Sequence, residues 1–437
     1  MMYLSRPTGR PLHDCFWKRI GLRRVAAWLL AVIVSSKALF AQDGQNIETN
    51  PPGDSVVHAN FEGQPTALEN SYSLPDNRAL RLISAGVDPV YQDMLGMRTN
   101  GWLGSDVDDS IVLSDTKTLW LFGDTFIGPL SNGVRVAGAP MINSTIGIQD
   151  RTKAPPDCMT FCWKTNHGKP ASFFPHQKHT PGSYYWVTKG VMLRGELFLF
   201  AWCISDTKDA VGWKEMGSVL IRVPNPLDPP EQWIQKAYPL KLKSGVTFHS
   251  ALFVKQPYLY LYGIVKPRQM ALARVRIDDL INGKLTAAYE YWVNDVNGPH
   301  WGSEPKNCAP QFLPVNSECA IHYEPAWDLY TCFTYDVLHP EIYLTTAREL
   351  TGPWGKPMPV YRVPEFHTFS FPVVAYAVRQ HPELSTKPGE IVLTYVTNVS
   401  GPPKVHFTEE GKTLYVPRFV RLELELASKT NNAGARW

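Results

Sequence analysis

Two aspartates near one end of a strand-like hairpin are the residues of this sequence best suited to chemistry. The stretch 120–128, WLFGDTFIG, begins with bulky apolar residues and then places a carboxylate at Asp124. The preceding strand-like segment, 106–113, begins with Asp106, and residues 114–117 form the turn between them. Antiparallel pairing about that turn sets Asp124 opposite Asp106. Paired carboxyl groups in a concave, partly desolvated place hold different pKa values, so one can act as acid and the other as base or nucleophile.

A structural role explains the same aspartates without any chemistry. An aspartate in a Gly-Asp-Thr corner accepts hydrogen bonds from the backbone N–H groups of its own loop. Asp108 and Asp109 are open to the same two interpretations. Glu318, at the start of the segment SECAIHY, is a further carboxylate beside a strand-like run.

Other polar and aromatic residues are candidates for binding a ligand. His249 opens the segment FHSALF, where it would bind ligand hydroxyls or a central cation, or serve as a hydrogen-bonded structural residue. Trp102 and Trp186 lie in a loop or near a strand start, where a ring can stack on a ligand, although most tryptophans pack in cores. Three more polar residues begin a strand-like piece or lie in a hairpin loop: Asn143, His381 and Glu383.

Short apolar and aromatic runs separated by Gly, Pro, Asp and Asn turns make up most of the chain. From residue 101 onward they form five units, each with two strand-like segments around a turn and a third strand-like piece. The third pieces are 144–149, 217–223, 271–277, 341–347 and 418–424. Five such units arranged radially predict an all-β fold, a five-bladed β-propeller. A β-sandwich with long loops is the alternative.

The composition agrees with this fold class and limits the partners. The 437 residues are 44% hydrophobic, which is enough for a sizeable core, and the 37 prolines disfavour long helices. The net charge of +3 gives no reason to expect nucleic acid or an anionic membrane as partner. We expect a monomer.

The first 41 residues have the pattern of an export signal. A basic region precedes the apolar run 25–34, VAAWLLAVIV, and cleavage is expected after Ala41. The run is too short for a permanent bilayer anchor, although a retained signal anchor is the alternative. We therefore expect a signal peptide over 1–41, an irregular N-terminal arm over 42–95, the propeller over 96–428 and a flexible tail over 429–437. The mature protein would be secreted or periplasmic, with no membrane contact after cleavage.

Cysteine usage agrees with export. Six cysteines follow the signal: Cys158, Cys162, Cys203, Cys308, Cys319 and Cys332. An even number in an oxidising compartment predicts disulfides without fixing their pairing. A zinc site is the rival interpretation, but neither a C-x-x-C pair nor a His-x-x-x-His spacing supports it. No protein metal ligands are predicted, and a structural Ca²⁺ stays open.

Several of these segments together resemble a known family. The stretch 101–128, GWLGSDVDDSIVLSDTKTLWLFGDTFIG, is followed by INSTIGI, SECAIHYEPAWDLYTCFTYD and HPELSTKPGEIVLTYVTN. Together they are similar to secreted bacterial domains of unknown function that carry a WLFGDT signature. The resemblance covers residues 95–425 approximately. These domains look like relatives of the five-bladed propeller glycosidases, which include arabinanases, xylosidases, invertases and levansucrases.

The resemblance implies hydrolysis of glycosidic bonds in a carbohydrate polymer, with arabinan as one candidate substrate. Those glycosidases place an acid at the start of the innermost strand of the first blade, which matches Asp106. A later blade supplies a glutamate as general acid, for which Glu318 is the best match. The third acid, expected on the second blade, has no counterpart in SYYWVTKG (183–190), and Asp124 would take its place.

That departure keeps other functions open. The main rival is a non-catalytic carbohydrate-binding or surface-associated propeller. An esterase is a third hypothesis, but the sequence contains no G-x-S-x-G elbow to support it.

Overall fold

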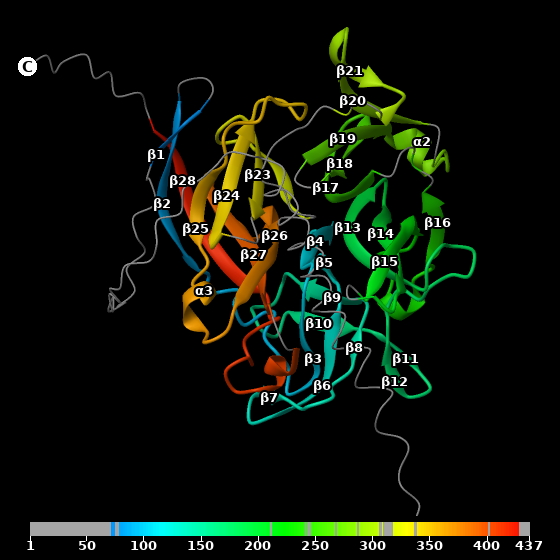
Figure 1. Cartoon of the computed structure of the whole chain (residues 1–437), viewed down its shortest axis with the longest axis vertical. Coiled ribbons are helices and arrows are strands. Elements are labelled where there is room, and N and C mark those ends of the chain that lie inside the picture. Colours follow the sequence, from blue (N-terminus) through cyan, green and yellow to red (C-terminus); the bar gives the residue numbers. More distant parts are fainter. Residues whose placement is uncertain are drawn as a thin grey trace, which may run out of the picture.

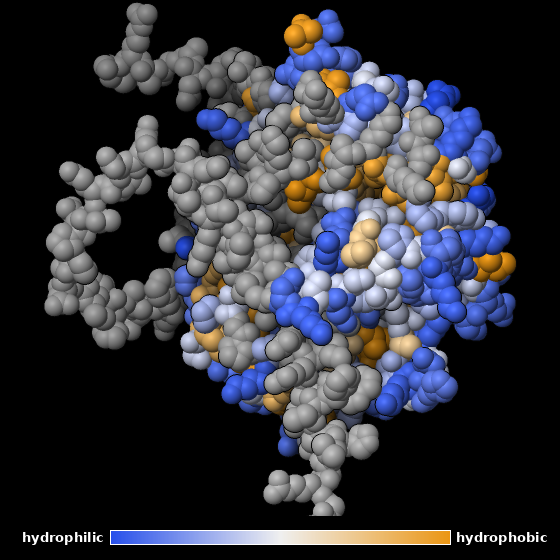
Figure 2. Space-filling model, turned by 45° about the vertical axis from the view of Figure 1, so that its right-hand side comes forward, coloured by the Kyte–Doolittle hydropathy of each residue, from blue (hydrophilic) through white to orange (hydrophobic). Residues whose placement is uncertain are grey.

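The computed structural model describes residues 71–74, 78–209, 212–240, 242, 246–266, 269–285, 288–305, 308, 318–335, 339–400 and 403–427. Of these, 56% lie in strands and 7% in helices, so the predicted all-β class is confirmed. The predicted signal peptide and C-terminal tail lie outside the described residues. On the face shown in Figure 2, the described surface is mainly hydrophilic, with hydrophobic side chains gathered in a few places.

Most strands belong to antiparallel sheets that follow one another along the chain (Figure 1). The first sheet contains β4 (Asp109–Ser114), β5 (Lys117–Phe122), β9 (Thr145–Asp150) and β10 (Met159–Cys162). The second contains β13 (Tyr184–Leu193), β14 (Glu196–Asp206), β15 (Trp213–Val223) and β16 (Lys236–Leu240). The third contains β17 (Thr247–Lys255), β18 (Tyr258–Lys266), β19 (Gln269–Arg276), β20 (Tyr289–Asp295) and β21 (Gly298–Gly302). The fourth contains β22 (Ala320–Glu324), β23 (Leu329–Tyr335), β24 (Glu341–Ala347) and β25 (Met358–Arg362).

The fifth sheet joins the two ends of the described chain. It contains β26 (Val373–Gln380), β27 (Glu390–Val399), β28 (Arg418–Ala427), β2 (Ala79–Val87) and β1 (Ser71–Ser73). The N-terminal β2 pairs with the C-terminal β28, so the blue and red ends of the chain lie side by side in Figure 1. The prediction of an irregular arm over 42–95 is therefore wrong for these two strands, because the edge of β28 offers backbone groups that β2 satisfies.

Two further small sheets and short helical turns accompany these five sheets. Their elements are β3 (Asn100–Ser105), β6 (Thr125–Ser131), β7 (Val134–Arg135), β8 (Met141–Ile142), β11 (Lys164–Asn166), β12 (Lys169–Ala171), α2 (Ile277–Ile281), α3 (Glu365–Thr368) and the 3₁₀ turns η1 (Pro230–Gln232), η4 (Pro382–Leu384) and η5 (Pro403–Phe407). Strands β3, β6, β7 and β8 form one small sheet, and β11 and β12 form the other. The strand predicted over 106–113 begins only at Asp109, and Asp106 lies in the turn between β3 and β4. The five predicted third pieces correspond to β9, β15, β19, β24 and β28.

Hydrophobic cores lie between consecutive sheets. Leu119 and Leu121 of the first sheet pack with Leu199 and Val219 of the second, and comparable clusters follow between the later sheets. Another cluster joins Trp120 and Phe122 of the first sheet to Val392 and Phe419 of the fifth. The first strand of each sheet also packs near the first strand of the next, from β4 through β13, β17 and β22 to β26. Each sheet is thus buried on both faces, which explains the continuous apolar runs of the inner strands.

The cysteines do not form the predicted disulfides, since all six are free thiols. Cys158 and Cys162 flank the extended strand β10, where four residues at about 3.3 Å each separate them well beyond the reach of a disulfide. No helix within the described residues has the length and apolar character that crossing a bilayer requires.

Candidate active site

A strained turn carries the first of the predicted acids. Val107 and Asp108 have left-handed φ angles of 76° and 49°, a conformation that costs free energy for residues other than glycine. The backbone carbonyl of Asp106 accepts a hydrogen bond of 2.9 Å from the N–H of Gly123, which ties this turn to the end of β5. The structure therefore brings Asp106 and Asp124 to the same end of the hairpin, as the sequence predicted.

The side chain of Asp106 is held by two phenols and a close glycine. The hydroxyl groups of Tyr376 and Tyr415 donate to its Oδ2 at 3.0 and 2.9 Å. A Cβ atom at Gly123 would lie 2.2 Å from Oδ1, so only glycine leaves room for the carboxylate. Burial raises the pKa of Asp106 well above its usual value; the charges of Asp124 and Glu318 raise it further, while the two phenols oppose the rise.

Asp124 lies between β5 and β6 and is 6% exposed. Its Oδ1 accepts hydrogen bonds from Nε1 of Trp186 at 3.1 Å and from Nδ2 of Asn143 at 3.3 Å. Trp186 and Asn143 were predicted as ligand-binding residues. The structure places them beside the acids, where they hold a carboxylate through their N–H groups.

Glu318 directly precedes Cys319 and β22, and it is 6% exposed. Its Oε1 accepts a hydrogen bond of 3.1 Å from Nη2 of Arg379, whereas its Oε2 has no partner among the described residues. Burial raises the pKa of Glu318, and the charges of Arg379 and Lys189 oppose this rise. The oxygen without a partner is itself buried, which favours a proton on it.

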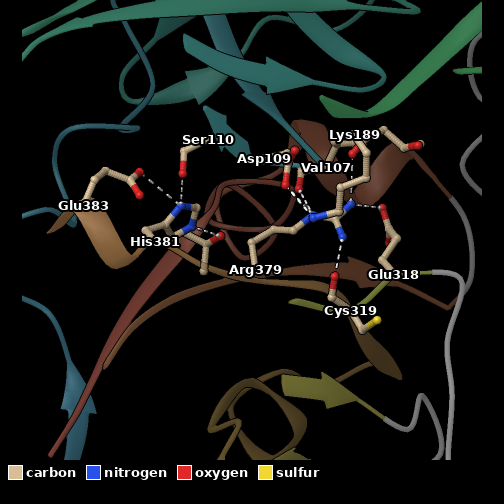
Figure 3. Close-up of polar contacts among 11 residues, drawn as sticks. Val107, Asp109, Ser110, Lys189, Glu318, Cys319, Arg379, His381 and Glu383 are labelled. Carbon is tan, nitrogen blue, oxygen red and sulfur yellow. Dashed lines mark hydrogen bonds and ion pairs between the residues drawn. The ribbon is translucent and has the colours of Figure 1, made fainter. Parts of the chain in front are cut away.

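Arg379 connects the acid turn to the strands around it (Figure 3). Its side chain is 1% exposed, and its Nε donates to the carbonyl of Val107 at 2.9 Å. The carbonyls of Cys319 and Thr188 each accept from the guanidinium at 3.4 Å. The buried guanidinium of Arg379, on β26, thereby contacts the acid turn, the second sheet and the segment that precedes β22. It also donates a charge-assisted hydrogen bond to Glu318.

A second buried ion pair lies next to Arg379. Nζ of Lys189 donates to Oδ1 of Asp109 at 2.6 Å, and the same Oδ1 lies 3.8 Å from Nε of Arg379 (Figure 3). Burial and the nearby Arg379 lower the pKa of Lys189. Lys189 belongs to the segment SYYWVTKG, so the second sheet contributes a cation where the resemblance led us to expect an acid.

Asp108 is the least satisfied acid of the group. It is fully buried, and neither carboxylate oxygen has a hydrogen-bond partner among the described residues. Burial raises the pKa of Asp108 well above its usual value, and the charge of Asp106 adds to the rise. A carboxyl group in this setting favours its protonated form.

Three of the predicted ligand-binding residues have buried side chains. Trp102 is 1% exposed and stacks on Phe161 with ring centroids 4.5 Å apart, so its faces are covered by the core. His381 is fully buried between the hydroxyl groups of Ser110 and Thr394, at 2.6 and 2.8 Å (Figure 3).

Glu383, the third of these residues, lies beside that histidine. Its Oε1 is 3.9 Å from Nδ1 of His381, and burial raises the pKa of its carboxyl group. Sequence position alone did not reveal the burial of these three side chains. Trp102 lies in β3, and His381 and Glu383 lie at η4, and both elements pack against the first and fifth sheets.

His249 is also buried, with its Nε2 2.9 Å from the hydroxyl group of Ser218. Burial lowers its pKa to about 3, so the imidazole is neutral at physiological pH. No group of three or more His, Cys, Asp or Glu side chains within the described part of the chain has the geometry of a metal site.

Four residues of the site were not predicted from the sequence: Lys189, Tyr376, Arg379 and Tyr415. The sequence did contain an indication for two of these residues, because Lys189 and Arg379 are charged residues within otherwise apolar strand segments. Charged residues are almost never fully buried unless they are paired. The tyrosines carried no comparable signal, because many tyrosines of this chain pack in its cores.

The arrangement is chemically suited to proton transfer. The charges of Asp124 and Glu318 both raise the pKa of Asp106, so ionisation of either disfavours ionisation of Asp106. Their hydrogen-bond donors differ: two phenols for Asp106, an indole and an amide for Asp124, and a guanidinium for Glu318. Carboxyl groups in such unlike environments can divide the roles of acid and base.

Comparison with solved structures shows a clear likeness in fold. A protein from Bacteroides ovatus, provisionally described as a hydrolase, superposes with a TM-score of 0.66 at 18% identity, covering 82% of this chain and 93% of that one. At this identity the likeness shows a shared fold.

Two enzymes of known type match more weakly. An α-L-arabinofuranosidase from Podospora anserina, crystallised with cellotriose, gives a TM-score of 0.42 at 10% identity over 76% of this chain and 95% of that one. A GH43 enzyme from Xanthomonas citri, crystallised with xylotriose, gives 0.40 at 10% identity over 79% and 92%. Neither score supports an argument about this chain.

No curated protein matches the sequence. A family described as "Domain of unknown function (DUF5005)" matches residues 88–426, which is well over half of the chain. The WLFGDT signature and the secretion expected from the resemblance stay predictions. The chain belongs to the DUF5005 family.

Proposed function

We propose that this protein is a glycoside hydrolase that cleaves glycosidic bonds in a polysaccharide. The observation that carries this proposal is the arrangement of three carboxyl side chains, Asp106, Asp124 and Glu318. A backbone hydrogen bond from Gly123 ties the Asp106 turn to Asp124, and Arg379 donates both to the carbonyl of Val107 in that turn and to Glu318. The charges of Asp124 and Glu318 raise the pKa of Asp106. Glycosidic bond cleavage needs two carboxyl groups, one to protonate the leaving oxygen and one to activate water or attack the sugar. An arabinan is the first substrate to test.

The fold proposed for this activity is a closed five-bladed β-propeller. The five sheets in chain order and the cluster that joins Trp120 of the first sheet to Phe419 of the fifth support it. A propeller places the first strands of its blades around a central axis, which suits the location of Arg379 and the acids. Export by the N-terminal signal, which would bring the enzyme to polysaccharide outside the cell, belongs to this proposal.

Asp106 acts as the base or nucleophile. Burial raises its pKa well above the usual value, and the two phenol O–H groups that donate to Oδ2 oppose this rise by stabilising the carboxylate form that either role requires. Asp124 lies beside this base, because the N–H of the preceding residue, Gly123, donates to the carbonyl of Asp106. The charge of Asp124 raises the pKa of Asp106 and thereby adjusts its strength as a base.

Glu318 acts as the general acid. Burial favours its protonated form, and Oε2 has no partner among the described residues, so it can present a proton to a leaving oxygen. Arg379 holds the opposite oxygen and thereby fixes the direction of the carboxyl group. After the proton has left, the guanidinium stabilises the carboxylate that remains.

A non-catalytic carbohydrate-binding protein is the second candidate. The observation that favours it is Lys189, which occupies the second-sheet segment where the glycosidases have an acid and is paired with Asp109. In such a protein the buried charges would be structural, and the acids would only accept hydrogen bonds from sugar hydroxyls.

Release of reducing ends from arabinans, xylans, fructans and galactans tests the proposal. We expect release by the wild-type protein and its loss in Asp106→Asn and in Glu318→Gln. Asp115→Asn, an exposed aspartate in the β4–β5 turn, is the matched control and should leave release unchanged. Where a polymer is cleaved, NMR of the first-formed anomer distinguishes inversion from retention. Binding of a polymer without release of reducing ends would favour the non-catalytic protein.

A further inference from the structure

A cluster of aromatic side chains covers one face of the second sheet next to Asp124. It contains Tyr184, Trp186, Trp202, Ile204 and Trp213. The ring of Trp186, whose N–H holds Asp124, lies 4.8 Å from the ring of Trp213 and 6.2 Å from that of Trp202. Trp202 and Trp213 are only half-buried. The cluster therefore extends from the carboxylate group toward the protein surface.

A β-bulge places a carboxylate on this same face. Cys203 of β14 pairs with Gly217 of β15, but Ile204 pairs with Glu215, so Met216 is the extra residue. Side chains directly opposite one another on paired strands share a face. Glu215 therefore shares the face of Ile204, whereas an unbroken register would turn it to the other side of the sheet. Bulges are over-represented beside active sites, where they redirect a side chain.

The surroundings of Glu215 are apolar. Glu215 is half-buried, and burial raises the pKa of its carboxyl group to about 7. Several N–H groups and ring nitrogens nearby have no hydrogen-bond partner among the described residues: Nε1 of Trp202, Nε1 of Trp213 and Nδ1 of His249. The ring of His249 lies 5.5 Å from that of Trp202. Buried polar atoms without partners are uncommon in native structures and call for an explanation.

We propose that this face of the second sheet is a sugar-binding subsite, in which Glu215 accepts hydrogen bonds from ring hydroxyls and Trp202 and Trp213 pack against the C–H face of the sugar. The inference rests on the proposed function, since it names the part of the site that would hold a ring of the substrate beside the cleaved bond. Aromatic surfaces with a few well-placed polar groups are typical of ligand sites.

The chemistry of the face favours a sugar over other ligands. At the end of the face that carries the aromatic cluster, the charged side chains of the described residues are the carboxylates Asp206 and Glu215. The two cations in register with this face lie farther along β14, Lys189 opposite Phe200 and Arg222 opposite Phe198, and they are paired with Asp109 and Glu196. An anionic ligand at the cluster would therefore be repelled. A quaternary ammonium ion suits an aromatic cage beside a carboxylate. It offers no acceptor for the indole N–H groups, however, whereas the hydroxyl groups of a sugar can both donate and accept.

Calorimetric titration of the full chain tests this inference separately from catalysis. Arabino-, xylo-, fructo- and galacto-oligosaccharides are titrated into the Asp106→Asn protein, so that binding is measured without cleavage. The substitution Glu215→Met is then combined with Asp106→Asn. We expect the affinity for the oligosaccharide that binds to fall about 10-fold, because the hydrogen bonds from ring hydroxyls to Glu215 are lost. Glu215→Gln, which keeps an acceptor oxygen, should retain most of the affinity. Glu231→Met is the matched control, because Glu231 is an exposed glutamate in η1, between β15 and β16 of the same sheet.

The outcomes separate the two proposals. Trp213→Phe is measured beside these variants. If the wild-type protein cleaves a polymer, but Glu215→Met, Trp213→Phe and the control all bind the oligosaccharide equally well, the subsite proposal is wrong and the proposed hydrolase activity stands. If the protein binds an oligosaccharide but cleaves no polymer, and if Glu215→Met weakens this binding while Glu215→Gln retains it, the subsite proposal is supported and the proposed hydrolase activity is rejected. Binding of choline in place of every oligosaccharide, or of none of these ligands, would overturn the subsite.

Discussion

Replacing Arg379 by methionine is the sharpest test of how the site is held together. Methionine keeps much of the apolar length of the side chain but removes the guanidinium, which is 1% exposed and donates to Glu318 and to three backbone carbonyls. Removing one partner of a buried ion pair costs about 3–5 kcal/mol, because the remaining charge is left uncompensated. We expect Arg379→Met to destabilise the fold by about this amount.

Unfolding in urea, followed by tryptophan fluorescence, measures the loss. The midpoint should fall while the slope stays that of the wild-type protein, since the surface exposed on unfolding is unchanged. Arg194→Met is the matched control: Arg194 pairs with Asp278 at the surface, where the side chains are 65% and 51% exposed. Exposed pairs contribute about 0–1 kcal/mol, so the control should be nearly neutral.

A double-mutant cycle with Glu318→Gln identifies the source of the loss. Glutamine removes the buried negative charge, so Arg379→Met should cost less in that background, with a coupling energy of about 1–3 kcal/mol. The reasoning would be refuted if Arg379→Met lost no more stability than Arg194→Met. Strict additivity of the two changes would equally show that the pair is not coupled.

Three further predictions concern the acid turn. Gly123→Ala should lower the rate of hydrolysis about 100-fold, because its Cβ displaces the carboxylate of Asp106; full activity would contradict the close contact. Tyr415→Phe removes a hydrogen bond that lowers the pKa of Asp106, so the acidic limb of the kcat/KM profile should move to higher pH, and an unmoved limb would exclude Asp106 as the base. Asp108 has a raised pKa in the fold, so its ionisation destabilises the protein as pH rises above the ordinary aspartate range. Thermal unfolding of Asp108→Asn should therefore show a larger gain over wild type at pH 8 than at pH 4, and an equal change at both would show that Asp108 does not titrate in this way.

Local sequence patterns predicted the secondary structure well because they act between near neighbours. The apolar runs and Gly, Pro, Asp and Asn turns of five units correspond to strands of the five sheets, including all five predicted third pieces. The hairpin of β4 and β5 also predicted that Asp106 and Asp124 lie together, since one short turn sets their register. The strand limits were less accurate, because the left-handed turn at Val107 ends the pairing before Asp106.

The partners of the acids were not predictable in the same way. Tyr376 and Tyr415 lie 270 and 309 residues from Asp106 in the sequence, and only the packing of the fifth sheet against the first brings them to its carboxylate. The location of Trp102 in the core follows from the same packing, since it lies in the cluster that joins Trp120 of the first sheet to Phe419 of the fifth.

The sequence by itself determined the β class, the order of the strands and the presence of two carboxylates at one hairpin end. Alternation, turn residues and one short loop are enough to specify these features. The tertiary structure decided which charges meet, which side chains are buried and which face Glu215 occupies. Those properties depend on the register and packing of strands far apart in the chain. A one-residue bulge at Met216 sets the face of Glu215, and one buried arginine, Arg379, supplies the hydrogen bond to Glu318.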